Sequence, residues 1–253
     1  MKFALLIGIN YKGIDNSELT GCIDDVLRMR DMLITELGYQ ATNITVLRDD
    51  TEDREFYPTK KNIIHHLREF MSNKADSDEL WFHYSGHGSI RRDRSNDEKE
   101  NIDSVLIPHD FQTNGVILDD DIYSIIKDVN CRLFLLFDCC HSGSICDLPW
   151  SVQYIDNQLT KTNINSNQHE NTNICAISGS TDKQLSMENY NDLLQKKVGA
   201  LTNAFLMLLH SNKYNMAIED LFIEICRYLS YIELEQTPIL SCTTEEITYT
   251  FES

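Results

Sequence analysis

Two segments of this chain place a histidine and a cysteine where a buried strand would give way to a loop. The apolar run 80–84 leads into Ser-Gly-His87, and the apolar run 133–137 leads into Asp-Cys-Cys140. A short apolar run that ends in small or polar residues is typical of a parallel strand that ends at the carboxyl-end crevice of an α/β sheet. Two such strands can present a thiol and an imidazole across one cleft, which is what a cysteine nucleophile needs from its base. The spacing therefore predicts the chemistry of a cysteine peptidase.

We expect Cys140 to be the nucleophile and His87 to be its base. A free thiol titrates near pH ~8.5, so attack near neutrality needs a base or a lowered pKa. Cys139 competes for the role of nucleophile, but adjacent residues of an extended strand point to opposite faces, so only one of the two thiols can meet His87. His141 is an alternative base, although we expect it to be structural.

The rest of the chain predicts the elements that position these residues. Strands alternate with helices over the first 140 residues, which predicts a largely parallel sheet covered by helices. Residues 151–173 are polar and rich in asparagine, with little periodicity, so we expect a mobile connector there. The expected strands are 3–9, 44–47, 80–84, 103–107, 133–137 and 174–178, and the expected helices are 21–37, 59–71, 119–129, 199–210 and 217–229.

Composition excludes some classes of function. The 253 residues are 42% hydrophobic and carry a formal charge of -18, which suits one large globular domain and argues against a nucleic-acid partner. No apolar run approaches the length of a membrane span. Met1-Lys2 leads directly into the strand 3–9, which is too short for the apolar region of a signal peptide. We therefore expect a cytoplasmic protein whose eight cysteines are mostly free thiols.

Several motifs in one order resemble those of the metacaspases. They are Leu-Thr-Gly-Cys-Ile-Asp-Asp-Val at 19–26, Tyr-Ser-Gly-His-Gly at 84–88, Asp-Cys-Cys-His-Ser-Gly at 138–143, Gly-Ala-Leu-Thr at 199–202 and Gln-Thr-Pro-Ile-Leu-Ser-Cys at 236–242. The resemblance covers essentially the whole chain and is closer to type I than to type II members, without a prodomain. It implies the caspase–hemoglobinase fold: one α/β structural domain in three layers, with a mostly parallel sheet. Its parts would be a large-subunit-like (p20) region at 1–150, the connector at 151–173 and a small-subunit-like (p10) region at 174–253.

The resemblance also implies which residues act on the substrate. It places the nucleophile immediately before His-Ser-Gly, which selects Cys140, and it makes the amides of Gly88 and Cys140 the oxyanion donors. Glycines at 86, 88 and 143 would let backbone N–H groups approach such an oxyanion.

Metacaspases cut after Arg or Lys with acidic residues in the S1 site, and the matching positions here are Asp25 and Asp138, beside Cys22 and Ser85. A buried carboxylate pair invites a guanidinium, because the forked donors of Arg satisfy both geometry and charge. The alternative is that Asp24 and Asp25 are an exposed pair at a helix start, favoured by the helix dipole.

Two weaker expectations concern calcium and self-cleavage. Many metacaspases bind Ca²⁺ as an activator through acidic residues, which would be Asp103, Asp119, Asp120 and Asp147 in this chain. Hard oxygen ligands gathered from several loops suit Ca²⁺ better than zinc. The alternative reading is helix N-terminal acids plus surface carboxylates. Lys161 is the candidate for self-cleavage, because it is the basic residue of the expected connector.

The resemblance therefore implies a calcium-stimulated cysteine endopeptidase that cleaves after Arg or Lys in protein or peptide substrates. We expect a monomer, which would be a zymogen if its own cleavage activates it. One alternative is a calcium-independent, paracaspase-like peptidase, which would keep the basic specificity without the metal. Another is a non-catalytic caspase-like regulator, against which the intact pair of His87 and Cys140 argues. An acyltransferase with the same dyad lacks any cofactor-binding signal.

Overall fold

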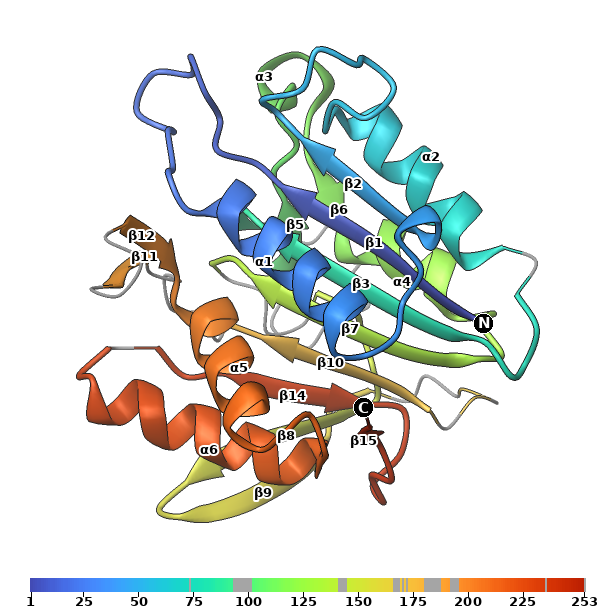
Figure 1. The fold of residues 1–253 in the computed structure, drawn as a ribbon, viewed down its shortest axis with the longest axis vertical. Coiled ribbons are helices and arrows are strands. Elements are labelled where there is room, and N and C mark those ends of the chain that lie inside the picture. The colour runs from blue at the N-terminus through green and yellow to red at the C-terminus, as the bar shows by residue number, and fades with distance from the viewer. Residues whose placement is uncertain are drawn as a thin grey trace.

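The computed structural model of the chain is built around a twisted central β-sheet (Figure 1). The structure describes residues 1–72, 74–92, 102–140, 145–165, 169, 171, 173–179, 188–191, 196–234 and 236–252. The sheet has eight strands in the order β2-β1-β3-β7-β10-β14-β8-β9. Neighbouring strands from β2 to β10 run parallel, and the pairs from β10 to β9 run antiparallel. The strands are β1 (Lys2–Gly8), β2 (Ile44–Arg48), β3 (Glu79–Ser85), β7 (Arg132–Asp138), β8 (Trp150–Ile155), β9 (Gln158–Asn163), β10 (Ile174–Ser178) and β14 (Ile239–Cys242).

Helices cover both faces of this sheet. Side chains of α1 (Cys22–Thr35), α5 (Ala200–Ser211) and α6 (Ile218–Tyr231) share one buried cluster with one face of the strands, and these helices lie in front of the sheet in Figure 1. Side chains of α2 (Lys60–Met71) and α4 (Asp119–Ile126) share a second cluster with the other face. Leu6 belongs to the first cluster and Ile7 to the second, because successive strand residues face opposite sides. Both faces are therefore buried, which explains why the strands are almost continuously apolar.

The smaller elements lie around this core. They are a short helical turn η1 (Ala41–Asn43), helix α3 (Phe111–Asn114), the sheet of β4 (Gly88–Arg92), β5 (Ile102–Leu106) and β6 (Ile117–Leu118), and the two-stranded pairs of β11 (Glu188–Asn191) with β12 (Lys196–Gly199) and of β13 (Met216–Ala217) with β15 (Thr250–Phe251). The strand expected at 103–107 is thus β5, and it lies outside the central sheet because it pairs with β4. No described helix is long and apolar enough to cross a membrane.

The expectation of a mobile connector at 151–173 is wrong for the first half of that range. Strands β8 and β9 form a hairpin that continues the central sheet, with Trp150 opposite Asn163 and Ile155 opposite Gln158. The turn consists of Asp156 and Asn157, whose φ angles are +49° and +63°. Two residues with positive φ between paired strands are typical of a type I′ hairpin turn, and Asp and Asn tolerate this conformation. The Asp-Asn pair is the sequence signal for this turn, and the polar composition of the surrounding segment made it easy to miss.

The hairpin is also tied to the rest of the fold by Lys161. Its ammonium group lies 2.8 Å from the carboxylate of Glu219 and donates a 2.8 Å hydrogen bond to the backbone carbonyl of Glu245. Cleavage after Lys161 would therefore require β9 to leave the sheet.

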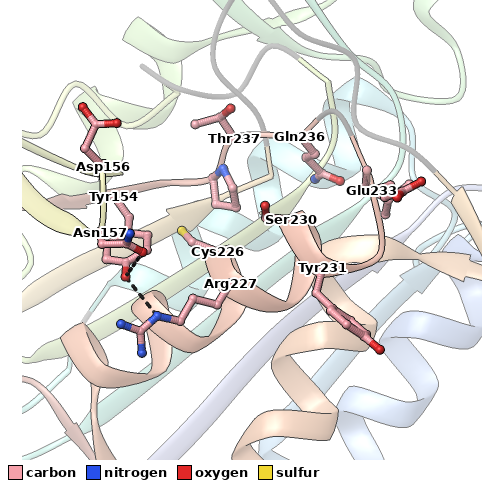
Figure 2. Close-up of a pocket in the computed structure, with 12 residues that line it drawn as sticks. Tyr154, Asp156, Asn157, Cys226, Arg227, Ser230, Tyr231, Glu233, Gln236 and Thr237 are labelled. Carbon is pink, nitrogen blue, oxygen red and sulfur yellow. Dashed lines mark hydrogen bonds between the residues drawn. The ribbon is translucent and has the colours of Figure 1, made fainter.

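A groove of about 870 Å³ lies between this hairpin, the end of α6 and residues 236–238 (Figure 2). Arg227 of α6 donates a 2.9 Å hydrogen bond from Nε to the hydroxyl of Tyr154, which the dashed line in Figure 2 marks. The residues that line the groove include neither His87 nor Cys140.

Limited trypsin digestion tests the position of Lys161. In the folded protein with Cys140 replaced by alanine, we expect no early cut after Lys161, because a strand paired within a sheet cannot enter a protease active site. The same bond should be cut readily in urea-denatured protein, which serves as the control. Rapid cleavage after Lys161 in the folded protein would contradict the hairpin. Mass spectrometry of the fragments identifies the cut sites.

Candidate active site

The ends of β3 and β7 bring the predicted histidine and cysteine to the same edge of the sheet. These two strands are parallel neighbours, and Ser85 lies opposite Asp138 at their carboxyl ends. His87 and Cys140 each follow two residues later. The backbones beyond the strands also touch, since a Cβ atom on Gly88 would lie 2.0 Å from the carbonyl oxygen of Cys140. Glycine at 88 is therefore required by close backbone approach.

The imidazole of His87 is oriented by a backbone carbonyl. Its Nε2 atom lies 2.8 Å from the carbonyl oxygen of Ser17. A carbonyl oxygen only accepts hydrogen bonds, so Nε2 carries the proton whenever the ring is neutral, and Nδ1 is then the acceptor nitrogen. His87 is thereby set up as a base at Nδ1.

Two tyrosine hydroxyl groups hold the backbone of His87. The amide of His87 donates to Oη of Tyr11 at 2.9 Å, and Oη of Tyr84 donates to the carbonyl oxygen of His87 at 2.8 Å. The ring of Tyr11 also lies against the imidazole, with 4.6 Å between ring centroids. Burial raises the pKa of both tyrosines, so both remain neutral and keep their hydroxyl protons. Sequence reasoning missed the role of both tyrosines, because Tyr84 ends an apolar strand, where Tyr is common for packing, and Tyr11 lies in a loop far from His87 in the sequence.

The structure separates the two neighbouring cysteines by burial. Cys139 is 1% exposed and belongs to the hydrophobic cluster beneath the sheet, whereas Cys140 is partly exposed. Adjacent side chains thus point to opposite sides, as the strand geometry predicts. His141 and Gly143 lie outside the described residues.

Beside this edge lies a pair of buried carboxylates, Asp25 and Asp138, which we call the acidic pair. Asp25 is in the first turn of α1 and is fully buried, and Asp138 ends β7 and is 5% exposed. An atom at the Cβ position of Gly199 would lie 2.2 Å from Oδ2 of Asp138 and 2.6 Å from Oδ2 of Asp25, so the two carboxylates face one small space. The alternative of an exposed helix-start pair is therefore wrong for Asp25.

The surroundings of Asp25 favour a proton on its carboxyl group. Burial, followed by the negative charge of Asp138, raises the pKa of Asp25 well above its ordinary value. The folded chain therefore holds a proton over a pH range in which the unfolded chain has released it. Since the unfolded state binds fewer protons there, the free energy of unfolding falls as pH rises through that range.

Groups close to Asp25 offset part of the free-energy cost of burying its carboxyl group. Ser85 donates from its hydroxyl to Oδ2 of Asp25 at 3.0 Å, and the amide of Gly199 donates to the same oxygen at 2.9 Å. The guanidinium of Arg28 lies 3.9 Å from Oδ1 of Asp25, which has no hydrogen-bond partner among the described residues. Cys22, the first residue of α1, is also buried. The four residues implied for the S1 site thus lie in the buried part of the chain beside the edge.

The four acids expected to bind calcium come from three separate segments. Asp119 is buried at the start of α4, where its carboxylate accepts the backbone N–H groups of Ser104 and Asp120. Burial, followed by the charges of Asp147 and Asp119, raises the pKa of Cys146, which places both acids near that thiol. Asp103 is buried in β5 opposite Arg91, and Asp120 is exposed. The described residues contain no group of three or more His, Cys, Asp or Glu side chains placed to hold a metal ion.

Sequence comparisons identify relatives of this chain. The family model for the metacaspase, peptidase C14 domain matches residues 2–149. Metacaspase-1 of Scheffersomyces stipitis is 45% identical over 152 residues, which is 59% of this chain and 38% of that protein. Metacaspase-1 of Kluyveromyces lactis is 38% identical over 212 residues, which is 83% of this chain and 46% of that protein. The chain thus spans less than half the length of these relatives.

Solved structures show the same fold. Caspase-1 from Spodoptera frugiperda matches with a TM-score of 0.59 at 11% identity and covers 97% of this chain and 88% of that one. A protein from Geobacter sulfurreducens matches with a TM-score of 0.67 at 20% identity and covers 100% and 94% of the two chains. These matches confirm the predicted caspase–hemoglobinase fold. With a family model that matches more than half of its residues, the chain belongs to the metacaspases, a family of cysteine endopeptidases.

Proposed function

We propose that the chain is a calcium-stimulated cysteine endopeptidase that cleaves protein substrates after Arg or Lys. The observation that carries the proposal is the position of a buried acidic pair next to the sheet edge at which both the cysteine and the histidine lie. Asp138 is two residues before Cys140, and Ser85, which donates to Asp25, is two residues before His87. Both reacting groups are therefore fixed to the same strands as the groups that would recognise the substrate.

Cys140 and His87 would divide the chemistry between them. His87 accepts the thiol proton at Nδ1 while Sγ of Cys140 attacks the scissile carbonyl carbon, and the amides of Gly88 and Cys140 stabilise the oxyanion. The imidazolium then gives the proton to the leaving amine, and an acyl-enzyme remains. Water hydrolyses this thioester with His87 as the base, which frees the thiol. The carbonyl of Ser17 keeps Nε2 protonated throughout and stabilises the imidazolium that forms in each half-reaction.

The acidic pair supports a basic residue at P1. Two buried like charges are unfavourable alone, and a guanidinium or ammonium group placed between them would neutralise them. Oδ1 of Asp25 accepts no hydrogen bond from the described residues, although the guanidinium of Arg28 lies 3.9 Å away, so this oxygen has acceptor capacity for a basic side chain. An aspartate at P1 would instead bring a third negative charge to the same place. Cys22 and Ser85 would form the remaining wall of this S1 site.

Calcium is proposed as an activator that takes no part in bond cleavage. Asp103, Asp119, Asp120 and Asp147 have the hard oxygen donors that Ca²⁺ prefers. They would have to converge to bind the ion, because they do not form such a group among the described residues. Asp147, whose φ is +46°, follows the nucleophile by seven residues. A movement of Asp147 on binding calcium would therefore shift the segment that contains Cys140.

Three further parts of the proposal concern form and regulation. We propose a monomer, and self-cleavage would act as a maturation step if β9 releases Lys161. A calcium-independent, paracaspase-like peptidase differs from the main proposal in the metal alone. A non-catalytic regulator would need neither an oriented His87 imidazole nor a partly exposed Cys140 thiol, so both features favour a peptidase.

Fluorogenic peptides that end in Arg, Lys or Asp test the peptidase and its specificity. We expect turnover of the Arg and Lys peptides alone, and none with Cys140→Ala or His87→Ala. Asp138→Asn should lower kcat/KM for the Arg peptide by at least about tenfold, because one charged hydrogen-bond acceptor is lost. Asp24→Asn, which removes a neighbouring acid outside the pair, is the matched control and should retain most activity. Cleavage after Asp, or no turnover by the unmodified chain, would contradict the proposal.

Calcium is tested separately by activity and by thermal unfolding. We expect millimolar Ca²⁺ to raise the melting temperature and the rate, EGTA to remove both effects and Mg²⁺ to reproduce neither. Asp147→Asn should abolish the calcium-dependent shift. Asp121→Asn, also in the acidic start of α4, should keep it. Equal activity in EGTA and Ca²⁺, with no shift in melting temperature, would favour the calcium-independent alternative.

A further inference from the structure

The N-terminus of α5 lies against the acidic pair. The amide of Gly199, the residue that precedes the helix, donates to Oδ2 of Asp25 at 2.9 Å. The amide of Thr202, in the first turn, donates to Oδ2 of Asp138 at 2.8 Å. The first amides of a helix have no partner within the helix, and α5 has no side-chain cap of its own. The two carboxylates, which come from α1 and β7, therefore cap α5 from outside.

We propose that the start of α5 is a part of the specificity site, in which Gly199 and Thr202 act as positioning residues for the two carboxylates. This inference rests on the proposed S1 role of the acidic pair. The positive end of the helix dipole favours negative charge at this place, which offsets part of the repulsion between the carboxylates. Both amides bind Oδ2 atoms, whereas Oδ1 of Asp25 accepts no hydrogen bond from the described residues and lies 3.9 Å from the guanidinium of Arg28.

The absence of a side chain at residue 199 leaves room for the two carboxylates. Gly199 has φ −62° and ψ 130°, a conformation that any residue adopts easily, so backbone freedom does not explain the glycine. Space does explain it, because a Cβ atom there would overlap Oδ2 of both Asp138 and Asp25. A side chain at 199 would push the carboxylates apart or displace the helix start. The separation of the acidic pair is thus set by this glycine.

His83 and Arg28 hold the helix start against the sheet and against α1. Nε2 of His83 lies 3.0 Å from Oγ1 of Thr202, and His83 is fully buried in β3. Burial lowers the pKa of His83 to about 3, so the ring is neutral and does not compete for the carboxylates. Arg28 donates a 3.0 Å hydrogen bond to Oδ1 of Asn203 in α5. The carboxylates are thus positioned by an element from the small-subunit-like region, although both belong to the other region.

The expected consequence is a loss of guanidinium recognition while Cys140 keeps its reactivity. A forked guanidinium needs two acceptors at a fixed separation, whereas an ammonium group does not. Gly199→Ala should therefore raise KM for the Arg peptide by about tenfold or more, with a smaller effect on the Lys peptide, so that the Arg-to-Lys ratio of kcat/KM falls. Alkylation of Cys140 by iodoacetamide should proceed at the unmodified rate.

A second variant tests the same inference in case Gly199→Ala does not fold. Thr202→Val keeps the amide but removes the hydroxyl that meets His83, and it should lower the same ratio, while Thr202→Ser restores it. An unchanged Arg-to-Lys ratio in Gly199→Ala and Thr202→Val would overturn the inference while the proposed function stands. A parallel loss of both activities and of alkylation would also overturn it, because that pattern indicates a merely structural role. If the unmodified chain cleaved neither peptide, the proposed function would fail, and the inference with it.

Discussion

The acidic pair is the constraint around which the rest of the site is built. Asp25 and Asp138 are buried acids from different elements, so a negative charge on both at once would be costly without the groups around them. Those groups come from every part of the chain: the hydroxyl of Ser85 on β3, the guanidinium of Arg28 on α1 and the amides at the start of α5. The pair therefore links α1, β7 and the start of α5, and its geometry depends on the packing of α1 and α5 against one face of the sheet.

The reacting residues are positioned by backbone more than by side chains. The register of β3 and β7 brings His87 and Cys140 to one edge, and the carbonyl of Ser17 selects the tautomer of the histidine. Two neutral tyrosines complete the hydrogen bonds of the His87 backbone. A parallel sheet buried on both faces supplies the rigid support that such a site needs, because few side-chain rearrangements are open to it.

Sequence reasoning predicted what periodicity and strand ends encode. The strands that end before His87 and Cys140 and the sheet covered by helices follow from local patterns, and the structure has them. The hairpin at 150–163 was missed because its strands are polar and lie at the end of the sheet, where alternation is weak. The roles of the Ser17 carbonyl and of the Gly199 and Thr202 amides could not be predicted, because a backbone group leaves no trace in the residue type. Gly199 carried a signal as a glycine before a helix, but its reason is spatial and needs the tertiary structure.

We infer that the acidic pair is kept at a cost to stability because the proposed S1 site needs it. The most direct test is thermal unfolding of Asp25→Asn and of the unmodified chain between pH 5 and pH 9. We expect the variant to be more stable, with an advantage that grows as pH rises, and an advantage on the order of 1 kcal/mol should appear as about 2–4 °C in Tm. The reason is that the neutral amide has no charge to bury beside Asp138. A variant that is less stable than the unmodified chain at every pH would show that the buried charge supports the fold, and would contradict the account.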